Sequence, residues 1–425
     1  MGKLKQFWRG LGPGLVVGAA DDDVSGITIY ALAGAKFGLA MLWTALATLP
    51  FMIVIQRMCG RIGLISGRGL AANMRKYYPG WLLFIVTISI LVASIVNIGA
   101  DISGMAAAIQ LIAPVPPLLI SAFFSFIIIF LLIFLSYRQI AHYLKWVALV
   151  MLSYVVAAFL VNEPWRQIVF RTFVPQWSNS KEYLAMLIAV AGTTISPYLF
   201  FWQAAEEIEE KTITKEGGDA MMPSVMPGKK VSKYIIRNEI TAMYKDIAWG
   251  MVFSNILTFF IIILASATLN AHGYTNVSTI QEIASILRPL AGPYANLLFL
   301  VGIVASGILA IPVLAGSAAY ALAEAFHWRQ GFENKFGRAK QFYVIIIIST
   351  LLGLLIPILH LDTINILFYT GVIFGAISPI LIAVVIHMAN NPKVMGIYTS
   401  RWWTNAIAYG LLIIMTASVI FGLIL

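Results

Sequence analysis

Cysteine is almost absent from this sequence, since Cys59 is its single example. A chain with one cysteine forms no internal disulfide and holds no cysteine-rich metal cluster. Charged residues are also scarce: they make up 11% of the 425 residues, whereas soluble proteins carry about 25%. The five histidines are scattered and lack the close spacing of a metal-binding motif. The scarcity of charged residues excludes an ordinary soluble domain.

Apolar residues are what the chain has in excess, at 60% with a mean hydropathy of +0.89. Windows of roughly 20 apolar residues are long enough to cross a bilayer as helices. Such windows lie near residues 11–35, 39–60, 81–108, 117–137, 143–161, 181–208, 239–268, 293–324, 341–360, 363–388 and 402–425. We therefore expect an all-α, polytopic membrane protein with about eleven transmembrane helices.

The basic residues indicate how these helices are oriented. With a cytoplasmic amino terminus, 22 of the 28 Lys and Arg residues fall in loops on the cytoplasmic side, as the positive-inside rule requires. The net charge of +10 is then a topology signal, and we expect no nucleic-acid partner. We expect a multi-pass protein of a bacterial inner membrane, in contact with the lipid bilayer and without an obligatory protein partner.

The chain divides at one long polar stretch. We expect six helices within residues 1–208, a cytoplasmic linker over 209–236, and helices seven to eleven within 237–425, all in a single membrane domain. The linker is predicted from its charged residues and from Pro223, Pro227 and Gly228.

Three consecutive acids, Asp21, Asp22 and Asp23, interrupt the first apolar window. A carboxylate at the centre of a membrane helix costs about 2.5 to 3.5 kcal/mol on insertion scales. Like charges at neighbouring positions also repel, so a cation among them would relieve the cost. This pattern indicates a functional site.

The sixth window is interrupted in the same way, by the stretch from Gly192 to Pro197. Interrupted segments at matching positions of two halves are typical of transporters built from inverted repeats, with the binding site near the bilayer midplane. A proline kink in an ordinary helix is the alternative for helix six alone. The pairing of the two interruptions favours the transporter.

The flanking residues resemble a known family. Gly12-Pro-Gly14, the run Ala33-Gly-Ala-Lys-Phe-Gly38 and the stretch from Arg61 to Ala71 are similar to the natural resistance-associated macrophage protein (NRAMP) family of divalent-metal transporters. The resemblance implies eleven helices with a five-plus-five inverted repeat of the LeuT type, and helices one and six interrupted. It is nearest to the NRAMP-related magnesium transporter branch.

The chain departs from the family pattern at both interruptions. Where the family has Asp-Pro-Gly-Asn in helix one, this chain has Asp23, Val24, Ser25 and Gly26. Where the family has a methionine in helix six, it has Ser196, so the soft thioether ligand is absent. The resemblance and the oxygen chemistry together predict these metal ligands: Asp23, Asp22, Gly26, Thr193 and Ser196. Residues of a second shell or pathway would be Asp21, Asn97, Asp101, Tyr198 and Gln203.

A site made only of oxygen ligands suits hard cations such as Mg²⁺ or Mn²⁺. Tyr198 and Gln203 stand where the family has histidines, and Gly104 stands where helix three often carries a glutamate. Neither tyrosine nor glutamine titrates near neutrality, so proton relay would be weakened. We therefore predict alternating-access transport of Mg²⁺ or Mn²⁺ without proton coupling and without a cofactor.

Other functions stay open at this stage. They are a proton-coupled Mn²⁺/Fe²⁺ symporter, a sodium-coupled transporter of small solutes on the same fold, a channel, and an intramembrane aspartyl protease. The protease would pair Asp23 with Asp101 but leaves the interruption in helix six without a role, so no enzyme is expected. Three aspartates would repel the anionic group that sodium-coupled solute transporters usually bind.

Overall fold

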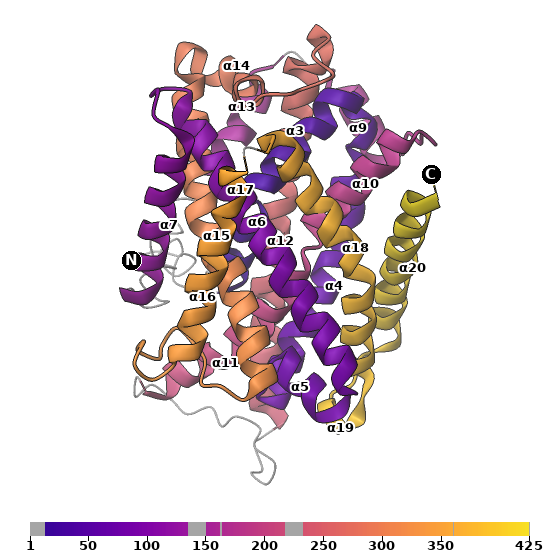
Figure 1. The fold of residues 1–425 in the computed structure, drawn as a ribbon. Helices are drawn as coiled ribbons and strands as arrows, with labels where there is room; N and C mark the ends of the chain where they lie inside the picture. Colours follow the sequence, from indigo (N-terminus) through magenta and orange to yellow (C-terminus); the bar gives the residue numbers. More distant parts are fainter. Residues whose placement is uncertain (1–12, 135–149, 162–163, 217–232, 360, 425) are drawn as a thin grey trace, which may run out of the picture.

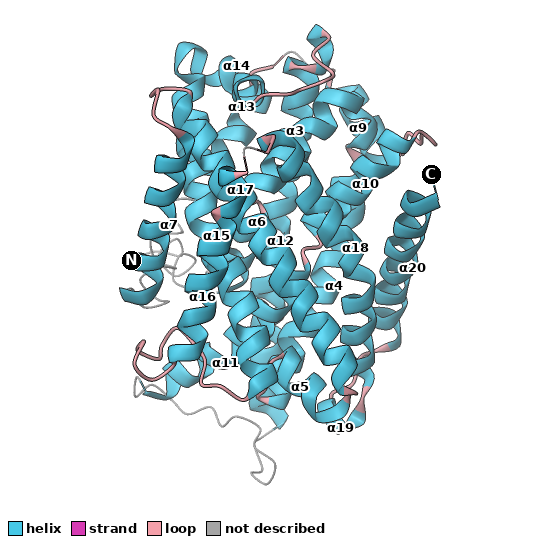
Figure 2. Cartoon of the chain, in the orientation of Figure 1, coloured by secondary structure: helices cyan, strands magenta, loops and turns pink. Residues whose placement is uncertain are grey.

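The computed structural model describes residues 13–134, 150–161, 164–216, 233–359 and 361–424. Within these residues the secondary structure is helical and contains no strand, as Figure 2 shows. Ten of the described helices are long and apolar enough to cross a membrane, and Val150–Phe159 is a shorter apolar helix. The fifth predicted window, 143–161, is described only from residue 150. The prediction of a polytopic, all-helical protein is confirmed.

The long helices follow the predicted windows closely. Their bounds are α4 (Trp43–Ser66), α6 (Gly80–Gln110), α7 (Pro117–Phe134), α12 (Lys233–Thr268), α15 (Ala295–Phe326), α16 (Lys340–Gly353), α18 (Thr363–Asn390) and α20 (Trp402–Ile424). The first and sixth windows each form two helices, α2 (Pro13–Asp21) with α3 (Val24–Phe37), and α10 (Lys181–Thr194) with α11 (Pro197–Glu216). Short helices join them: α5 (Leu70–Tyr77), α9 (Trp165–Phe173), α13 (Ile280–Ala284), α14 (Arg288–Ala291), α17 (Leu355–Ile358) and α19 (Pro392–Met395).

The second helix is displaced towards the carboxyl end from its predicted window of 39–60. Residues Gly38–Met41 form a 3-10 turn, and α4 then runs to Ser66. It ends there because Gly67 adopts the left-handed conformation, with φ of +63°, and its N–H bonds to the carbonyl of Gly63.

Helical structure extends into both ends of the predicted linker of 209–236. Helix α11 continues to Glu216, and α12 begins at Lys233. Residues 209–216 are polar but contain good helix formers, and the first glycines of the stretch are Gly217 and Gly218. Polarity alone therefore did not mark the helix end. Residues 217–232 lie outside the described residues.

The two halves of the chain are interleaved. Helix α12 of the second half packs along α2 and α3, while α11, from the second broken helix, packs along α4 of the first half. Helices α6 and α15 run side by side (Figure 1). Each broken helix therefore packs against helices of the other half, and both interruptions are enclosed by protein. Irregular backbone is tolerated at membrane depth only in such enclosed positions.

Candidate metal site

The first interruption is a two-residue break between α2 and α3. Helix α2 ends at Asp21, and Asp23 caps the amino end of α3 with an extended backbone. One oxygen of the Asp23 carboxylate, Oδ1, accepts hydrogen bonds of 2.6 Å from the Gly26 N–H and from the Ser25 hydroxyl. An N-cap aspartate satisfies amide groups that a new helix leaves free. The predicted interruption of helix one is confirmed.

The second interruption lies between α10, which ends at Thr194, and α11, which begins at Pro197. Proline is favoured in the first turn of a helix because it lacks the N–H that would be unpaired there. The hydroxyl of Tyr198 donates a 2.9 Å hydrogen bond to the carbonyl oxygen of Ala20 in α2. This bond places the two interruptions next to each other, as the sequence predicted.

The other oxygen of Asp23 faces α6. The side-chain amide of Asn97 donates a 2.7 Å hydrogen bond to Asp23 Oδ2. One turn further along α6, Asp101 Oδ1 accepts a 3.2 Å hydrogen bond from the Ser25 N–H. The predicted pathway residues Asn97 and Asp101 therefore lie at the first interruption.

The remaining two acids face a different helix. Ser254 of α12 donates its hydroxyl to Asp21 Oδ2, at 2.9 Å, and lies 3.3 Å from Asp22 Oδ1. The Ser306 hydroxyl of α15 donates a 2.6 Å hydrogen bond to the backbone carbonyl of Asp22. The carboxylates of Asp21 and Asp22 thus point away from the carboxylate of Asp23. In the described part of the chain, no three His, Cys, Asp or Glu side chains form a group that could hold a metal ion.

Three oxygens surround the position of Gly26. A Cβ atom built on Gly26 would lie 3.3 Å from the backbone oxygen of Asp21, from Asp23 Oδ1 and from Thr193 Oγ1. Ser196 lies beside Asp21, and its hydroxyl donates to the Thr193 carbonyl. The structure therefore brings Asp23, Gly26 and Thr193 together at one point, with Ser196 beside it.

The site is closed to bulk water in this structure. The side chains of Asp21 and Asp22 are fully buried, and Asp23 is 2% exposed. Several buried oxygens accept no hydrogen bond from the residues that the structure describes: Asp21 Oδ1, Asp22 Oδ2, Asn97 Oδ1 and Asp101 Oδ2. Buried acceptors without partners are costly, and a cation is a ligand that would satisfy them.

Gly104 and Gln203 stand at positions that the sequence analysis linked to proton relay. At Gly104, a Cβ atom would lie only 2.5 Å from Cγ1 of Val24, so the present packing leaves no space for a larger side chain. Gln203 lies about two turns along α11 from Ser196 and donates a 2.9 Å hydrogen bond to Glu207 Oε1. That bond stays within α11 and does not involve the acids of the first interruption.

Sequence reasoning missed Ser254 and Ser306. Both lie within apolar helices and are fully buried. Serines are common in such helices, and nothing in the local sequence separates these two from serines that bond to their own helix. Their role follows only from the packing of α12 and α15 against the first interruption.

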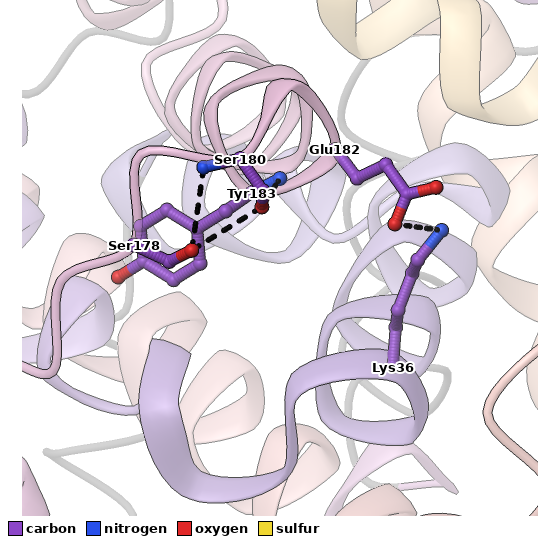
Figure 3. Close-up of polar contacts among 5 residues, drawn as sticks. All are labelled: Lys36, Ser178, Ser180, Glu182 and Tyr183. Carbon is purple, nitrogen blue, oxygen red and sulfur yellow. Dashed lines mark hydrogen bonds and ion pairs between the residues drawn. The ribbon is translucent and has the colours of Figure 1, made fainter.

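The outer parts of the two broken helices are joined by an ion pair. Lys36 Nζ, in the last turn of α3, lies 3.1 Å from Glu182 Oε2, in the first turn of α10 (Figure 3). Ser180 caps α10 by accepting a 3.2 Å hydrogen bond from the Tyr183 N–H. A cation at a helix carboxyl end and an anion at an amino end are both favourable positions.

Comparison with known proteins identifies the family. The sequence profile described as natural resistance-associated macrophage protein-like (Nramp) matches residues 14–425. The chain belongs to the Nramp family. The divalent metal cation transporter MntH of Agrobacterium fabrum is 27% identical over 304 residues, which are 70% of this chain and 62% of that protein. MntH of Listeria innocua is 22% identical over 312 residues, which are 72% of this chain and 65% of that protein.

Both alignments span less than two thirds of the length of these relatives. Among solved structures, the Eremococcus coleocola manganese transporter in complex with an aromatic bis-isothiourea compound has a TM-score of 0.79 at 16% identity. That match covers 100% of this Nramp chain and 87% of the other. MhsT in complex with L-phenylalanine gives a TM-score of 0.62 at 15% identity and 97% coverage of both chains. These likenesses confirm the predicted LeuT-type fold.

Proposed function

We propose that this Nramp protein is a secondary transporter, and not an enzyme, that moves a divalent metal cation across the membrane by alternating access. The named relatives are divalent metal cation transporters, and the similar Eremococcus coleocola structure is of a manganese transporter. The transported ion would bind between the two interruptions, with Asp23 as its principal anionic ligand.

The observation that carries this proposal is the approach of oxygens from both broken helices beside Gly26. A backbone carbonyl, a carboxylate oxygen and a hydroxyl, from Asp21, Asp23 and Thr193, each lie 3.3 Å from the position that a Cβ atom on Gly26 would take. These oxygens come from both broken helices, so relative motion of the helices would assemble or separate the ligands. Ser196 would add an oxygen directly or through water, and Asp22, whose carboxylate faces Ser254 of α12, would add negative charge nearby.

The chemistry of this oxygen set supports Mg²⁺, with Mn²⁺ as a second substrate. Carboxylate, carbonyl and hydroxyl oxygens are hard ligands and favour Mg²⁺ and Mn²⁺ over softer ions. Mg²⁺ gives up its water reluctantly and usually keeps several waters when bound by proteins. Ser196 and Gly26 are smaller than the family's methionine and asparagine, which would favour a hydrated ion when the site opens.

We further propose that transport proceeds without proton coupling. Val24 Cγ1 occupies the space that any side chain at position 104 would enter. The Tyr198 hydroxyl is committed as a donor to the Ala20 carbonyl. A membrane potential, inside negative, would then drive uptake by about 2.3 kcal/mol per charge per 100 mV.

Uptake into proteoliposomes tests both proposals. The full chain is reconstituted, a potential is imposed, and Mg²⁺, Mn²⁺ and Ca²⁺ uptake is measured while an internal dye reports pH. We expect Mg²⁺ and Mn²⁺ uptake without acidification, and loss of uptake in Asp23→Ala. Thr193→Val should reduce uptake, whereas Thr350→Val is the matched control, because that buried hydroxyl bonds to its own helix at Ile346.

Three results would contradict these proposals. Normal uptake by Asp23→Ala would remove the proposed ligand, and equal effects of Thr193→Val and Thr350→Val would remove the second broken helix from the site. Acidification in step with Mn²⁺, without Mg²⁺ flux, would favour a proton-coupled Mn²⁺/Fe²⁺ symporter instead.

A further inference from the structure

Helix α5 lies at one end of the helix bundle (Figure 1). A basic cavity beside α5 is lined by residues that are not part of the candidate metal site. It has a volume of about 760 Å³ and is formed by α5, the end of α15 and the segment that follows α15. Four cationic side chains line it: Arg68, Arg75, Lys76 and Arg329. A cavity lined by one sign of charge concentrates ions of the opposite sign.

Among the described residues that line the cavity, Glu324 is the one carboxylate, and it is already engaged. Glu324 of α15 is 5% exposed, and its Oε2 accepts a 3.1 Å hydrogen bond from the Ala72 N–H at the start of α5. Its Oε1 accepts another 3.1 Å bond from the Gln330 side chain. Glu324 thus links α5 to α15. Its one negative charge lies among the four positive charges of the cavity lining.

The Arg75 side chain is held by backbone carbonyls at the end of α15. Its guanidinium donates to the backbone carbonyl of Glu324 and lies 3.4 Å from that of Ala325. Partial burial lowers the pKa of Arg75. The negative charge of Glu324 raises this pKa, and the like charge of Arg68 lowers it further. Because an arginine titrates far above neutrality, the guanidinium remains charged. It is therefore a cation of fixed orientation that lies near a second cation.

Aromatic side chains lie at one edge of the cavity. Trp328 lines it and stacks on Phe326 with ring centroids 5.0 Å apart and an interplanar angle of 20°. Both rings are partly exposed, at 36% for Trp328 and 58% for Phe326. Exposed aromatic residues at the end of a transmembrane helix are typical of the level of lipid headgroups.

We propose that this cavity is a binding site for a phosphate group, carried by an anionic phospholipid or by a soluble phosphate compound. Arginine guanidinium groups bind phosphate oxygens with paired hydrogen bonds, and lysine adds a point charge. A bound phosphate would bridge Arg75, which is anchored to α15, with Arg68 before α5 and Arg329 after α15. It would thereby reinforce the Glu324 connection between these elements.

The test compares two double variants of the full-length protein. Arg68→Gln/Arg329→Gln removes two charges from the cavity. Lys335→Gln/Arg338→Gln removes two charges from the segment after α15 at positions that do not line the cavity. Thermal unfolding of protein stripped of lipid is followed by tryptophan fluorescence with inorganic phosphate alone, with phosphatidylglycerol, or with neutral phosphatidylcholine.

We expect phosphatidylglycerol to raise the unfolding temperature of the wild type and of Lys335→Gln/Arg338→Gln, and binding to Arg68→Gln/Arg329→Gln to be at least about tenfold weaker. A shift with inorganic phosphate as well assigns the site to soluble phosphate compounds, whereas a shift with phosphatidylglycerol alone assigns it to a lipid headgroup. Equal shifts in both double variants, or none in the wild type, overturn the proposal. Arg329→Gln alone, at an exposed position, serves if the cavity variant does not fold.

Discussion

Asn97 donates its side-chain amide to Asp23 Oδ2 at 2.7 Å, and so connects α6 to the break between α2 and α3. The opposite oxygen of the same carboxylate accepts from Ser25 and Gly26. The Asp23 carboxylate is therefore held on both sides, with its Oδ1 turned towards Thr193 across the Gly26 backbone. Groups that orient a metal ligand in this way normally matter almost as much as the ligand itself.

The first prediction concerns this orienting bond. Asn97→Ala leaves Asp23 in place but frees its Oδ2, so we expect metal affinity to fall by about 10- to 100-fold. The measurement is the concentration of Mg²⁺ or Mn²⁺ that gives half-maximal uptake in proteoliposomes. Ser94→Ala is the control, because Ser94 is buried one turn earlier on α6 and its hydroxyl has no hydrogen-bond partner within the described part of the chain. An unchanged half-maximal concentration in Asn97→Ala would show that Asp23 needs no support from α6.

A second prediction separates Asp21 and Asp22 from Asp23. Ser254→Ala removes the hydroxyl that lies within hydrogen-bond distance of both carboxylates. A hydrogen bond to a charged group is worth about 1.5 to 3 kcal/mol, so we expect lower thermal stability and weaker metal binding. Ser125→Ala is matched in size and burial, but its hydroxyl bonds to the carbonyl of Ser121 in its own helix.

Ser125→Ala should lose little in either assay. If Ser254→Ala is no less stable than Ser125→Ala and its metal affinity is unchanged, Asp21 and Asp22 do not depend on α12. Weaker binding in Ser254→Ala with Asp23 intact would indicate that the acids facing α12 contribute charge to the site.

The sequence could predict where the two helices are interrupted, but not where the side chains at the interruptions point. Both interruptions were predictable, because three aspartates in one apolar window and a Gly-to-Pro stretch in another are costly unless the helix is broken there. The divergence of the three carboxylates was not predictable. Asp23 has an extended backbone, with φ of −69° and ψ of −178°, between the end of α2 and the start of α3, and the directions of the three side chains follow from how α6 and α12 pack around this break.

The serine contacts could not be predicted either. A buried serine usually bonds to the carbonyl four residues earlier, as Ser103 does to Gly99. Whether a serine instead reaches a neighbouring helix is decided by packing that brings together residues more than 200 positions apart, as for Ser254 and Asp21. The end of α11 was not predicted for a local reason, since helix-forming polar residues extend this helix to Glu216.

A third prediction concerns the ion pair between the outer half-helices. Lys36 and Glu182 are partly exposed, with 30% and 68% of their side-chain surfaces accessible, so the pair should contribute only about 0.2 to 1 kcal/mol. Reversing both charges should restore only part of the loss from either single reversal, because each charge would then oppose its helix end. A double-mutant cycle of thermal unfolding at low salt measures the coupling, and the same cycle at about 1 M salt should show almost none. A coupling that persists at high salt would mean that the pair is buried from ions.

The last prediction uses the contact between α3 and α6. Gly104→Ala would place a methyl group 2.5 Å from Cγ1 of Val24, and such overpacking typically costs about 1 to 3 kcal/mol. In a Val24→Ala background the obstructing methyl groups are gone. The alanine at position 104 should then stabilise α6, because glycine within a helix costs about 0.5 to 1 kcal/mol relative to alanine. The sign of the Gly104→Ala effect on the unfolding temperature should therefore reverse between the two backgrounds.

Gly80→Ala controls for the general effect of replacing a glycine in α6, because a Cβ atom there would have no neighbour within 4 Å. Its effect on the unfolding temperature should be the same in the wild-type and the Val24→Ala backgrounds. If Gly104→Ala is equally destabilising in both backgrounds, another contact excludes the side chain. If the sign reverses, the Val24 side chain is what excludes a larger residue from position 104, and a glutamate there would require a smaller residue at position 24 as well.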